Sequence, residues 1–472
     1  MGEKLNSVCA CVRARFQCDS PHRENADFLY FAEILADKKS HYQLPRLPPL
    51  PLMVVTFSTW RRQIAKHLLV GGEYADVRRI LRLLVRQLVS LVAISNGAFS
   101  WPVLRCWLAK LVILLLGLLV FLLLKRFITL HGYTMHMARN EQEFTVRQLV
   151  MHDPLREAVK KMAEPYAVVM LNQHALTMTL NWLCNTAGMA GVHERTLFFA
   201  LDDTARDALL RDYPKLTVVR FDAPSIQSHF TPFDATYMSF FLLRTNLIRA
   251  LLRFGKDFWM IQADTFWRSS LFDLPLTEEE RDAAILLDHP GYGESAPSHQ
   301  NTMNGANFFL PAKRSDTRRL LDKWRDLQAW ACTADPDILK MYCTRGDFKC
   351  RFLDYKRIAG WEWIYGPQRD PPLLMQMDGE TGGDKVSVLA SYGLWFLDDW
   401  HSTVTQSPVC RADRVQAAIR AVESAQVPRV YSGSKVRQAV LMRLGELLEH
   451  VPLFSSFYAV YGGIPSLYLQ IF

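Results

Sequence analysis

The sequence predicts an α/β fold with a mainly parallel central sheet flanked by helices. Three continuous apolar runs have strand character, at residues 166–171, 196–201 and 216–221. Segments of helical pattern accompany them, at residues 176–184 and 239–254. Continuous apolar strands that alternate with helices are typical of a parallel sheet, because crossover helices bury both of its faces.

The chain of 472 residues is long enough for one large domain with an N-terminal extension. Residues 1–110 carry 16 Lys and Arg against 8 Asp and Glu, so they hold the whole net charge of +8. We divide the chain into a basic arm (1–105), a transmembrane signal-anchor (106–130), a stem (131–144) and the α/β domain (145–472).

The arm is expected to be partly disordered, with one amphipathic helix. Residues 1–50 are irregular and end in a proline-rich stretch. Within 74–94, Arg78, Arg82 and Arg86 recur every four positions, which suits either a membrane surface or packing on a neighbouring domain. A basic arm beside an apolar span favours membrane lipid as a partner over nucleic acid, because no zinc-ligand spacing or RNA-binding aromatic motif accompanies it.

The centre of the predicted anchor is a run of 14 apolar residues, 111–124. A bilayer requires about 20 such residues. Apolar neighbours extend the run on both sides, and Lys110 and Lys125 can extend their ammonium groups to the interface. A buried core helix is the alternative. The basic arm favours a cytosolic N-terminus, which predicts a single-pass protein of the Golgi or endoplasmic reticulum membrane with its C-terminal domain in the lumen.

The cysteines that follow the predicted anchor bear on this location. A lumenal domain can form disulfides, and an odd number of cysteines leaves one thiol unpaired. Cys343 and Cys350 are the expected short-loop pair, and free buried thiols are the alternative. The five cysteines are Cys184, Cys332, Cys343, Cys350 and Cys410.

Polar residues follow the predicted strands at the position where a parallel sheet binds ligands. Asn172 and Asp202 follow the first two strands, and Asp264 follows a further strand that begins at Phe258. A carboxylate at the exit of a buried strand can hold a divalent cation against a diphosphate. Segment 258–267 is therefore the most informative part of the sequence.

The order of short motifs resembles the nucleotide-diphospho-sugar transferase domain, which has a glycosyltransferase fold of the GT-A type. The resemblance covers roughly residues 145–400 and implies the same GT-A-like fold here. Each motif is weak alone, and their order and spacing carry the resemblance. The motifs are residues 180–184, 200–203, 243–245, 262–267, 304–309 and 376–385.

Two of these motifs depart from the family's pattern. The family has Asp-x-Asp-x-x-Trp at the central motif, whereas this chain has Gln262 in the first position and keeps only Asp264. The C-terminal motif resembles His-x-Asn-x-x-x-Gly-x-x-Lys, with Gln376 for the histidine, Asp378 for the asparagine and Lys385 retained. Either Asp264 and Asp378 together bind Mn²⁺ or Mg²⁺, or dependence on a metal has been lost.

The resemblance implies a role for each matching residue. Asp378 and Lys385 are the expected catalytic residues, because charge on the departing diphosphate must be stabilised by a metal ion or a lysine. Each of the others has a structural alternative: helix capping, a surface ion pair, core packing or an ordinary turn. Donor contacts are assigned to Asp202 (the nucleoside), Arg244, Gln262 and Asp264, and contacts with the sugar or acceptor to Trp267, Asn304 and Asn307.

The activity that the resemblance implies is glycosyl transfer. A hexosyl- or pentosyltransferase would move a sugar from a nucleotide-diphosphate donor to a glycan or glycoprotein acceptor, with retention of configuration and help from a metal. The alternative is a catalytically inactive lumenal relative that binds nucleotide-sugar or glycan without transfer, which Gln262 and Gln376 motivate. No nucleophile elbow, Walker loop or paired-histidine zinc motif is present in the sequence.

Overall fold

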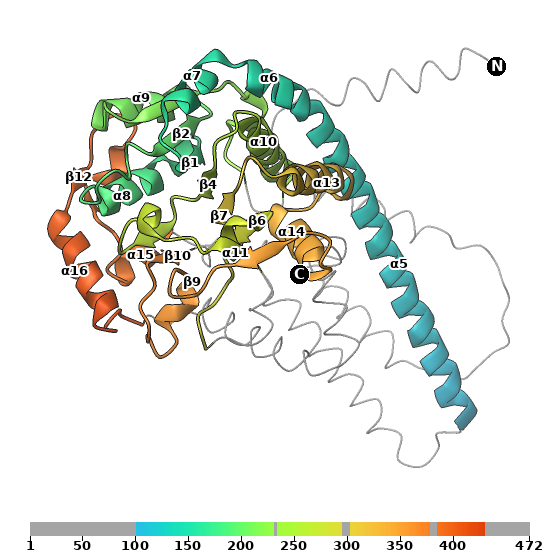
Figure 1. Ribbon diagram of the computed structural model, residues 1–472. Helices are drawn as coiled ribbons and strands as arrows, with labels where there is room; N and C mark the ends of the chain where they lie inside the picture. Colours follow the sequence, from blue (N-terminus) through green and yellow to red (C-terminus); the bar gives the residue numbers. More distant parts are fainter. Residues whose placement is uncertain (1–100, 231–233, 295–302, 378–384, 430–472) are drawn as a thin grey trace. The chain divides into compact units, whose positions relative to one another are not determined.

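The computed structural model describes residues 101–230, 234–294, 303–377 and 385–429 (Figure 1). The chain divides into two compact units, one of residues 1–114 with the last residue and one of residues 115–471. The predicted amphipathic helix at 74–94 lies outside the described residues. All the strands reported below belong to the second unit.

Helix α5 runs from Trp101 to Asn140 and contains the segment predicted as the anchor. Among the helices of the described part of the chain, none is both long enough and apolar enough to cross a membrane. The transmembrane helix predicted at 106–130 is therefore not confirmed.

The second unit is built on a seven-stranded sheet in the order β3-β2-β1-β4-β7-β6-β8. Strands β1 (Tyr166–Leu171), β2 (Thr196–Ala200) and β3 (Thr217–Arg220) coincide with the three predicted strands. They are parallel to one another, and β4 (Phe258–Ile261) is parallel to β1. The prediction of an α/β fold with a mainly parallel sheet is confirmed.

The rest of the sheet is mixed. Strand β7 (Phe308–Leu310) is antiparallel to both β4 and β6 (Ile285–Leu287), and β8 (Cys350–Phe352) is parallel to β6. Since β4 and β7 run in opposite directions, the loop before β7 lies at the same sheet edge as the turn after β4. This arrangement brings the segment around Asn304 next to the segment around Asp264.

Helices cover both faces of the sheet, which explains why its central strands are apolar throughout. In β1, Val168 and Met170 contribute to one buried cluster, whereas Val169 and Leu171 contribute to the other. Figure 1 shows the two sets of helices around the sheet. The first cluster includes residues of α6 (Val146–Met151), α7 (Asp153–Lys161), α10 (Ala235–Leu252) and α13 (Ser315–Ala331); the second includes residues of α8 (Leu176–Thr186), α9 (Asp203–Asp212) and α16 (Ala412–Glu423).

A small second sheet joins the C-terminal motif to the central one. Strand β10 (Leu374–Gln376) pairs antiparallel with β5 (Thr265–Trp267) and parallel with β9 (Ile358–Gly360). In this register Gln376 lies opposite Thr265, and the Met377 amide donates to the Asp264 carbonyl at 2.9 Å. The pairing fixes Gln376 beside the Asp264 side chain.

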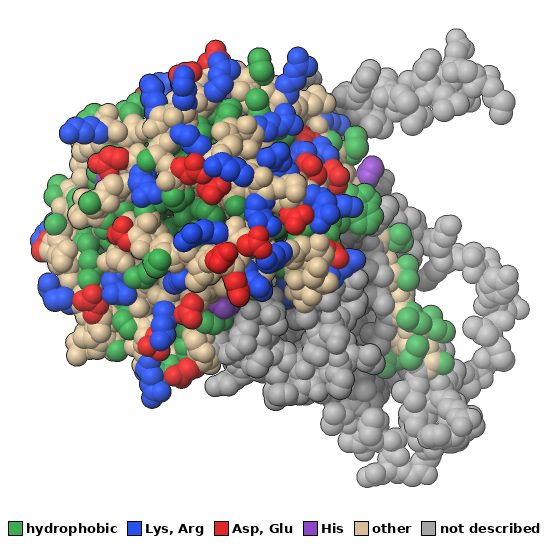
Figure 2. Space-filling model, viewed as in Figure 1, with side chains coloured by type: hydrophobic (Ala, Val, Ile, Leu, Met, Phe, Trp, Pro, Cys, Tyr) green, Lys and Arg blue, Asp and Glu red, His purple; other side chains and the backbone are tan. Residues whose placement is uncertain are grey.

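The unit contains two disulfides, one within a short loop and one between distant parts of the sequence. Cys343 pairs with Cys350, which confirms the expected short-loop pair, and Cys184 of α8 pairs with Cys410 of β12 (Val409–Cys410). Cys332 is buried and belongs to neither of these disulfides. On the face drawn in Figure 2, basic and acidic side chains are interspersed, which agrees with the 39 Lys and Arg and 39 Asp and Glu in residues 111–472.

Candidate active site

A cavity of about 780 Å³ lies at the carboxyl ends of β1 and β4, where a parallel sheet is expected to bind its ligand. One part of its wall is apolar and includes Phe230, Tyr237, Phe240 and Phe241 beside and within the first turns of α10. The polar part comes from the turn after β4, the loop before β7 and the starts of α14 (Asp335–Thr344) and α15 (Lys385–Ser391). Five predicted site residues line it: Arg244, Gln262, Asp264, Asn304 and Lys385.

The Asp264 carboxylate is held by nitrogen donors. The Lys385 ammonium lies 2.5 Å from Asp264 Oδ2, and Gln376 Nε2 donates to Asp264 Oδ1 at 3.2 Å. The side chain of Asp264 retains 14% of its accessible surface. Asp264 and Lys385, predicted separately from two motifs, therefore form one ion pair at the wall of the cavity.

Gln262 connects this ion pair to Arg244. We assign the oxygen and nitrogen of the Gln262 amide by the hydrogen bonds that they can make. In this assignment, the nitrogen donates to Asp264 Oδ1 at 3.2 Å and the oxygen accepts from Arg244 Nη1 at 3.2 Å. Lys385, Asp264, Gln262 and Arg244 thus form a continuous polar chain along the cavity.

Arg244 is a buried residue of α10, which rules out a surface ion pair as its role. Its Nη2 donates to the Gly305 carbonyl at 2.5 Å, and its Nη1 lies 3.4 Å from Asp335 Oδ2. The guanidinium also lies over the Phe308 ring, 4.9 Å from its centroid, in a cation–π contact. A buried guanidinium requires such partners, because an uncompensated charge in the interior is costly.

Asp335 is a site residue that the sequence analysis missed. It begins α14, lines the cavity and is fully buried. Among the described residues, neither of its carboxylate oxygens accepts a hydrogen bond from another residue. Burial raises the pKa of Asp335 to about 6, and the positive charge of Arg244 opposes this rise. The Asp-Pro-Asp sequence at a helix start was the available signal.

Asp288, which was also missed, does not line the cavity but holds the loop before β7. It directly follows β6, so the rule that selected Asp264 at a strand end would also have selected Asp288. Its carboxylate accepts from the Gly305 amide at 3.0 Å and from the Asn307 amide at 2.9 Å. Burial raises the pKa of Asp288 to about 7, and these hydrogen bonds and Arg244 oppose the rise.

The two predicted asparagines have different environments. Asn304 lines the cavity. Asn307 is fully buried and does not: its side-chain amide donates to Asp288 Oδ2 at 3.1 Å and to Gln376 Oε1 at 2.8 Å. Direct contact of Asn307 with sugar was the expectation, and the structure instead gives it the role of holding Gln376 and Asp288.

Gly305 lies between them at a position that only glycine fits. Its φ of +74° is in the left-handed region, and a Cβ atom there would lie 2.6 Å from Pro336 Cγ. Its carbonyl accepts from Arg244 and its amide donates to Asp288. The glycine therefore allows the loop before β7 to approach α14 closely.

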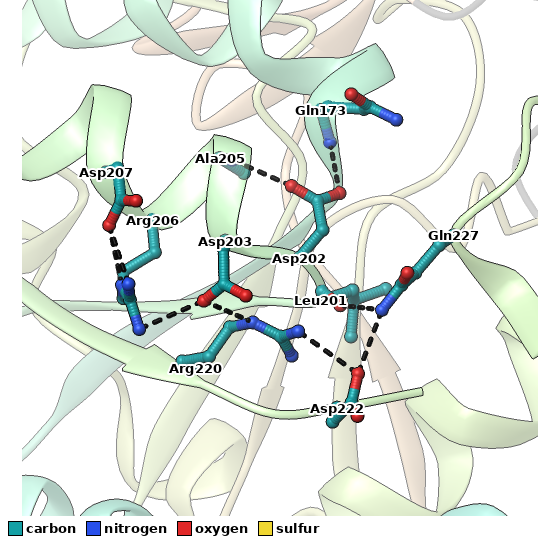
Figure 3. Close-up of polar contacts among 10 residues, drawn as sticks. All are labelled: Gln173, Leu201, Asp202, Asp203, Ala205, Arg206, Asp207, Arg220, Asp222 and Gln227. Atoms are coloured by element: carbon teal, nitrogen blue, oxygen red, sulfur yellow. Dashed lines mark hydrogen bonds and ion pairs between the residues drawn. The ribbon is translucent and has the colours of Figure 1, made fainter. Parts of the chain in front are cut away.

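Asp202, expected to bind the nucleoside, serves as the N-cap of α9 (Figure 3). Its Oδ1 accepts from the Ala205 amide and its Oδ2 accepts from the Gln173 amide, both at 2.7 Å. The carboxylate ties the turn after β1 to the start of α9. It is buried and does not line the cavity, so helix capping, the structural alternative, is the role that its contacts show.

Trp267 lies in the core and not at the cavity. Its side chain is fully buried, and its Nε1 donates to Thr265 Oγ1 at 3.0 Å. Its ring packs edge-on against Trp182, with 5.4 Å between the ring centroids. Stacking on a sugar would require this core to open. Trp267 is therefore a core residue, and its expected contact with sugar or acceptor does not fit its position.

The expected metal site is only partly covered by the structure, because Asp378 lies outside the described residues. Within the described ranges, no group of three or more His, Cys, Asp or Glu side chains is arranged to bind a metal. Mn²⁺ and Mg²⁺ require oxygen ligands, whereas the contacts on Asp264 come from nitrogen donors. The described groups around Asp264 therefore do not fit such a cation. Metal binding by Asp264 together with Asp378 stays a prediction.

One family model matches the part of the chain that holds this site. Residues 191–389, from the segment before β2 into α15, match the family model described as nucleotide-diphospho-sugar transferase. A comparison with curated proteins gave no match. This match covers less than half of the 472 residues, and within it the chain is similar to nucleotide-diphospho-sugar transferases.

Solved structures of glycosyltransferases show low overall similarity to this chain. Mouse xyloside xylosyltransferase 1 has 13% identity over 47% of this chain and 100% of that one, with a TM-score of 0.32. The galactosyltransferase LgtC, solved with donor and acceptor sugar analogues, has 12% identity over 56% and 97%, with a TM-score of 0.32. The bifunctional glycosyltransferase WbbM has 11% identity and a TM-score of 0.32, and the match spans 46% of each chain.

Proposed function

We propose that this protein is a glycosyltransferase that moves a sugar from a nucleotide-diphosphate donor to a glycan or glycoprotein acceptor. One observation carries the proposal. Within the region that matches the family, the Lys385–Asp264 pair and Arg244 line a single cavity at the carboxyl ends of β1 and β4. The donor's diphosphate is assigned to the Lys385 end of this cavity.

Transfer breaks the bond between the anomeric carbon and the diphosphate oxygen. The bonding electrons leave with the diphosphate, and the Lys385 ammonium is placed to stabilise the charge that develops there. The acceptor hydroxyl oxygen forms the new bond to the anomeric carbon, and its proton passes to the departing diphosphate. Retention of anomeric configuration is also part of the proposal and rests on the family resemblance; the anomeric signals of the product in a proton NMR spectrum test it.

Asn304 and Asp335 are the proposed contacts for sugar hydroxyls. Both line the cavity, and Asp335 lies 3.4 Å from Arg244 Nη1, at the end of the polar chain opposite Lys385. An amide and a carboxylate suit hydroxyl groups as hydrogen-bond partners. Whether the sugar is a hexose or a pentose depends on the room in this part of the cavity, and a panel of donors that differ only in sugar tests it.

The central test is a donor screen on the full-length protein that measures released nucleotide. Asp264→Asn removes the charge that orients Lys385, so we expect transfer to fall by at least about 100-fold, with an unchanged thermal midpoint. The matched control is Asp370→Asn, since Asp370 is exposed and pairs with Lys356 outside the cavity. Wild-type activity in the Asp264→Asn variant would contradict the assignment.

A non-catalytic binding protein is the second candidate, and Gln262 and Gln376 favour it. Both amides occupy positions where the family has Asp and His, and both hydrogen-bond to Asp264. This candidate predicts that nucleotide-sugar binds but that no nucleotide is released, with or without an acceptor. The donor screen and a binding titration together distinguish the two functions.

We also propose that the α/β domain works in the lumen of the endoplasmic reticulum or Golgi. The disulfides Cys184–Cys410 and Cys343–Cys350 support this, because disulfides persist in oxidising compartments and are rare in the cytosol. Alkylation of thiols in intact cells tests it: in the lumen, these four cysteines stay unmodified until a reductant is added.

A further inference from the structure

We infer that the donor diphosphate binds without a divalent cation, because the Lys385 ammonium occupies the place beside Asp264 that a cation would take. The inference rests on the proposed function and concerns the same cavity. Its starting point is the 2.5 Å contact between Lys385 Nζ and Asp264 Oδ2. A cation bound to that oxygen would have to displace the ammonium or lie against it.

The other carboxylate oxygen of Asp264, Oδ1, also accepts hydrogen bonds. Asp264 Oδ1 accepts from Gln376 Nε2 and from the Gln262 amide nitrogen, each at 3.2 Å. Each oxygen of Asp264 thus faces N–H groups. A carboxylate that binds Mn²⁺ or Mg²⁺ must direct its lone pairs at the metal, so these contacts compete directly with coordination.

The two glutamines do not supply replacement oxygen ligands. Gln376 Oε1 accepts from Asn307 Nδ2 at 2.8 Å, and the Gln262 oxygen accepts from Arg244 Nη1 at 3.2 Å. Gln376 is fully buried. Rotating its amide to present the oxygen to a metal would break its bonds to both Asn307 and Asp264. The amides that replace the family's Asp and His therefore donate to Asp264 and use their oxygens elsewhere.

Asp335 does not complete a metal site with Asp264. Its carboxylate lies 3.4 Å from Arg244 Nη1, and Arg244 in turn binds Gln262. Cation and carboxylate therefore alternate along the cavity: Lys385, Asp264, Arg244 and Asp335. A fixed ammonium placed by a carboxylate can bind diphosphate oxygens directly, as a point charge with N–H donors.

The first experiment requires no variant. Binding of UDP and of GDP to the full-length protein is measured by calorimetry in excess EDTA and again with MnCl₂ or MgCl₂. We expect the same dissociation constant within about twofold in both conditions. Binding only in the presence of a metal would overturn this inference and leave the proposed function standing. No binding in any condition would contradict the proposed donor site, and this inference with it.

The second experiment tests the lysine. Lys385→Met removes the charge at similar volume, and we expect nucleotide affinity in EDTA to fall at least tenfold, with partial recovery in Lys385→Arg. Lys356→Met is the matched control, because Lys356 is an exposed lysine outside this cavity. Unchanged affinity in a folded Lys385→Met variant would overturn the inference.

The third experiment uses the metal alone. Gln262→Asp replaces an N–H donor to Asp264 with a second carboxylate. We expect this variant to bind Mn²⁺, followed by electron paramagnetic resonance, at least tenfold more tightly than the wild type. A wild-type protein that already binds one Mn²⁺ tightly, with loss in Asp264→Asn, would overturn the inference independently of any activity measurement.

Discussion

Arg244 is the cation on which two buried carboxylates of the site depend. It pairs with Asp335 and lowers the pKa values of both Asp335 and Asp288 against the effect of burial. Removing one partner of a buried ion pair costs about 3–5 kcal/mol, because the other charge is left uncompensated. Replacing Arg244 with an apolar residue would therefore test folding and not donor binding, which makes Lys385 the better probe of the site.

The raised pKa of Asp335 predicts a pH dependence of stability. Because the folded protein binds this proton more tightly than the unfolded chain, the group's favourable contribution is full below about pH 4. It is lost as pH rises through the folded pKa of about 6. We expect Asp335→Asn to reduce the fall in unfolding free energy between pH 4 and 6, measured with urea at a series of pH values. Asp288 remains in the variant, so part of the fall persists.

The control for this prediction is Asp370→Asn, because Asp370 is exposed and forms an ion pair with the exposed Lys356. Its pH profile should match that of the wild type. An Asp335→Asn variant with the wild-type slope between pH 4 and 6 would show that the pKa of Asp335 is not raised in the folded protein.

Gly305 allows a prediction with a closely matched control. Gly305→Ala and Gly346→Ala both place a side chain at positive φ, +74° and +71°, but only at Gly305 would the new Cβ meet Pro336. Both variants lose unfolding free energy because the backbone conformation is unfavourable for alanine. Gly305→Ala loses about 1–3 kcal/mol more, because its Cβ overpacks against Pro336. Urea unfolding measures the difference. Equal losses in the two variants would mean that α14 moves away without cost.

At the scale of single elements, Asp202 shows how a strand-end carboxylate can be structural. We expect Asp202→Ala to destabilise the protein by about 1–3 kcal/mol, because it removes the cap of α9 and leaves the buried Ala205 amide without its acceptor. The Gln173 amide also loses its acceptor. Asp234→Ala is the comparison, since Asp234 caps α10 by accepting from the Tyr237 amide at 2.7 Å. Chemical unfolding of both variants measures the loss.

The same variant tests the expectation that Asp202 binds the nucleoside. If Asp202 only caps α9 and orders the turn at Gln173, then Asp202→Ala should lower nucleotide affinity less than Lys385→Met does, in calorimetric titrations with UDP. A larger loss of affinity in Asp202→Ala than in Lys385→Met would return Asp202 to the donor site.

Local pattern predicted the elements with long apolar runs and missed those without them. Strand β1 matches its prediction, because its six consecutive apolar residues have the length and composition of a strand buried on both faces. Strands β6, β7 and β8 have three residues each, too few for a period to show. Their antiparallel insertion beside β4 was not predicted for this reason.

The sequence identified several residues of the site, because they belong to motifs in the turns that follow strands. It did not identify the contacts between them. Asp264 and Lys385 were identified separately, but their contact depends on the pairing of β5 with β10, which joins segments far apart in sequence. Contact with sugar or acceptor was expected of Trp267 and Asn307, and core packing was the alternative for Trp267. Both side chains are buried, which does not fit such contact. A motif gives the residue type at a position, whereas burial by distant segments decides whether that residue reaches the cavity.

At the scale of the whole molecule, the cavity belongs to one unit of the chain. Every residue that lines it lies within 115–471. We therefore expect a chain that lacks residues 1–100 to bind UDP or GDP with unchanged affinity and to keep its thermal midpoint. Loss of nucleotide binding in a truncated chain that is still folded would assign a part of the donor site to the basic arm.

Cys184 leaves the ribosome long before its partner Cys410, because 226 positions separate the two. Cys332, Cys343 and Cys350 are synthesised in between. In an oxidising lumen, three other thiols are therefore available to pair with Cys184 before Cys410 is synthesised. If Cys184 pairs first with one of these three, thiol–disulfide exchange is needed to form the Cys184–Cys410 bond. We expect the yield of folded protein in that case to follow the disulfide-isomerase capacity of the cell that produces it.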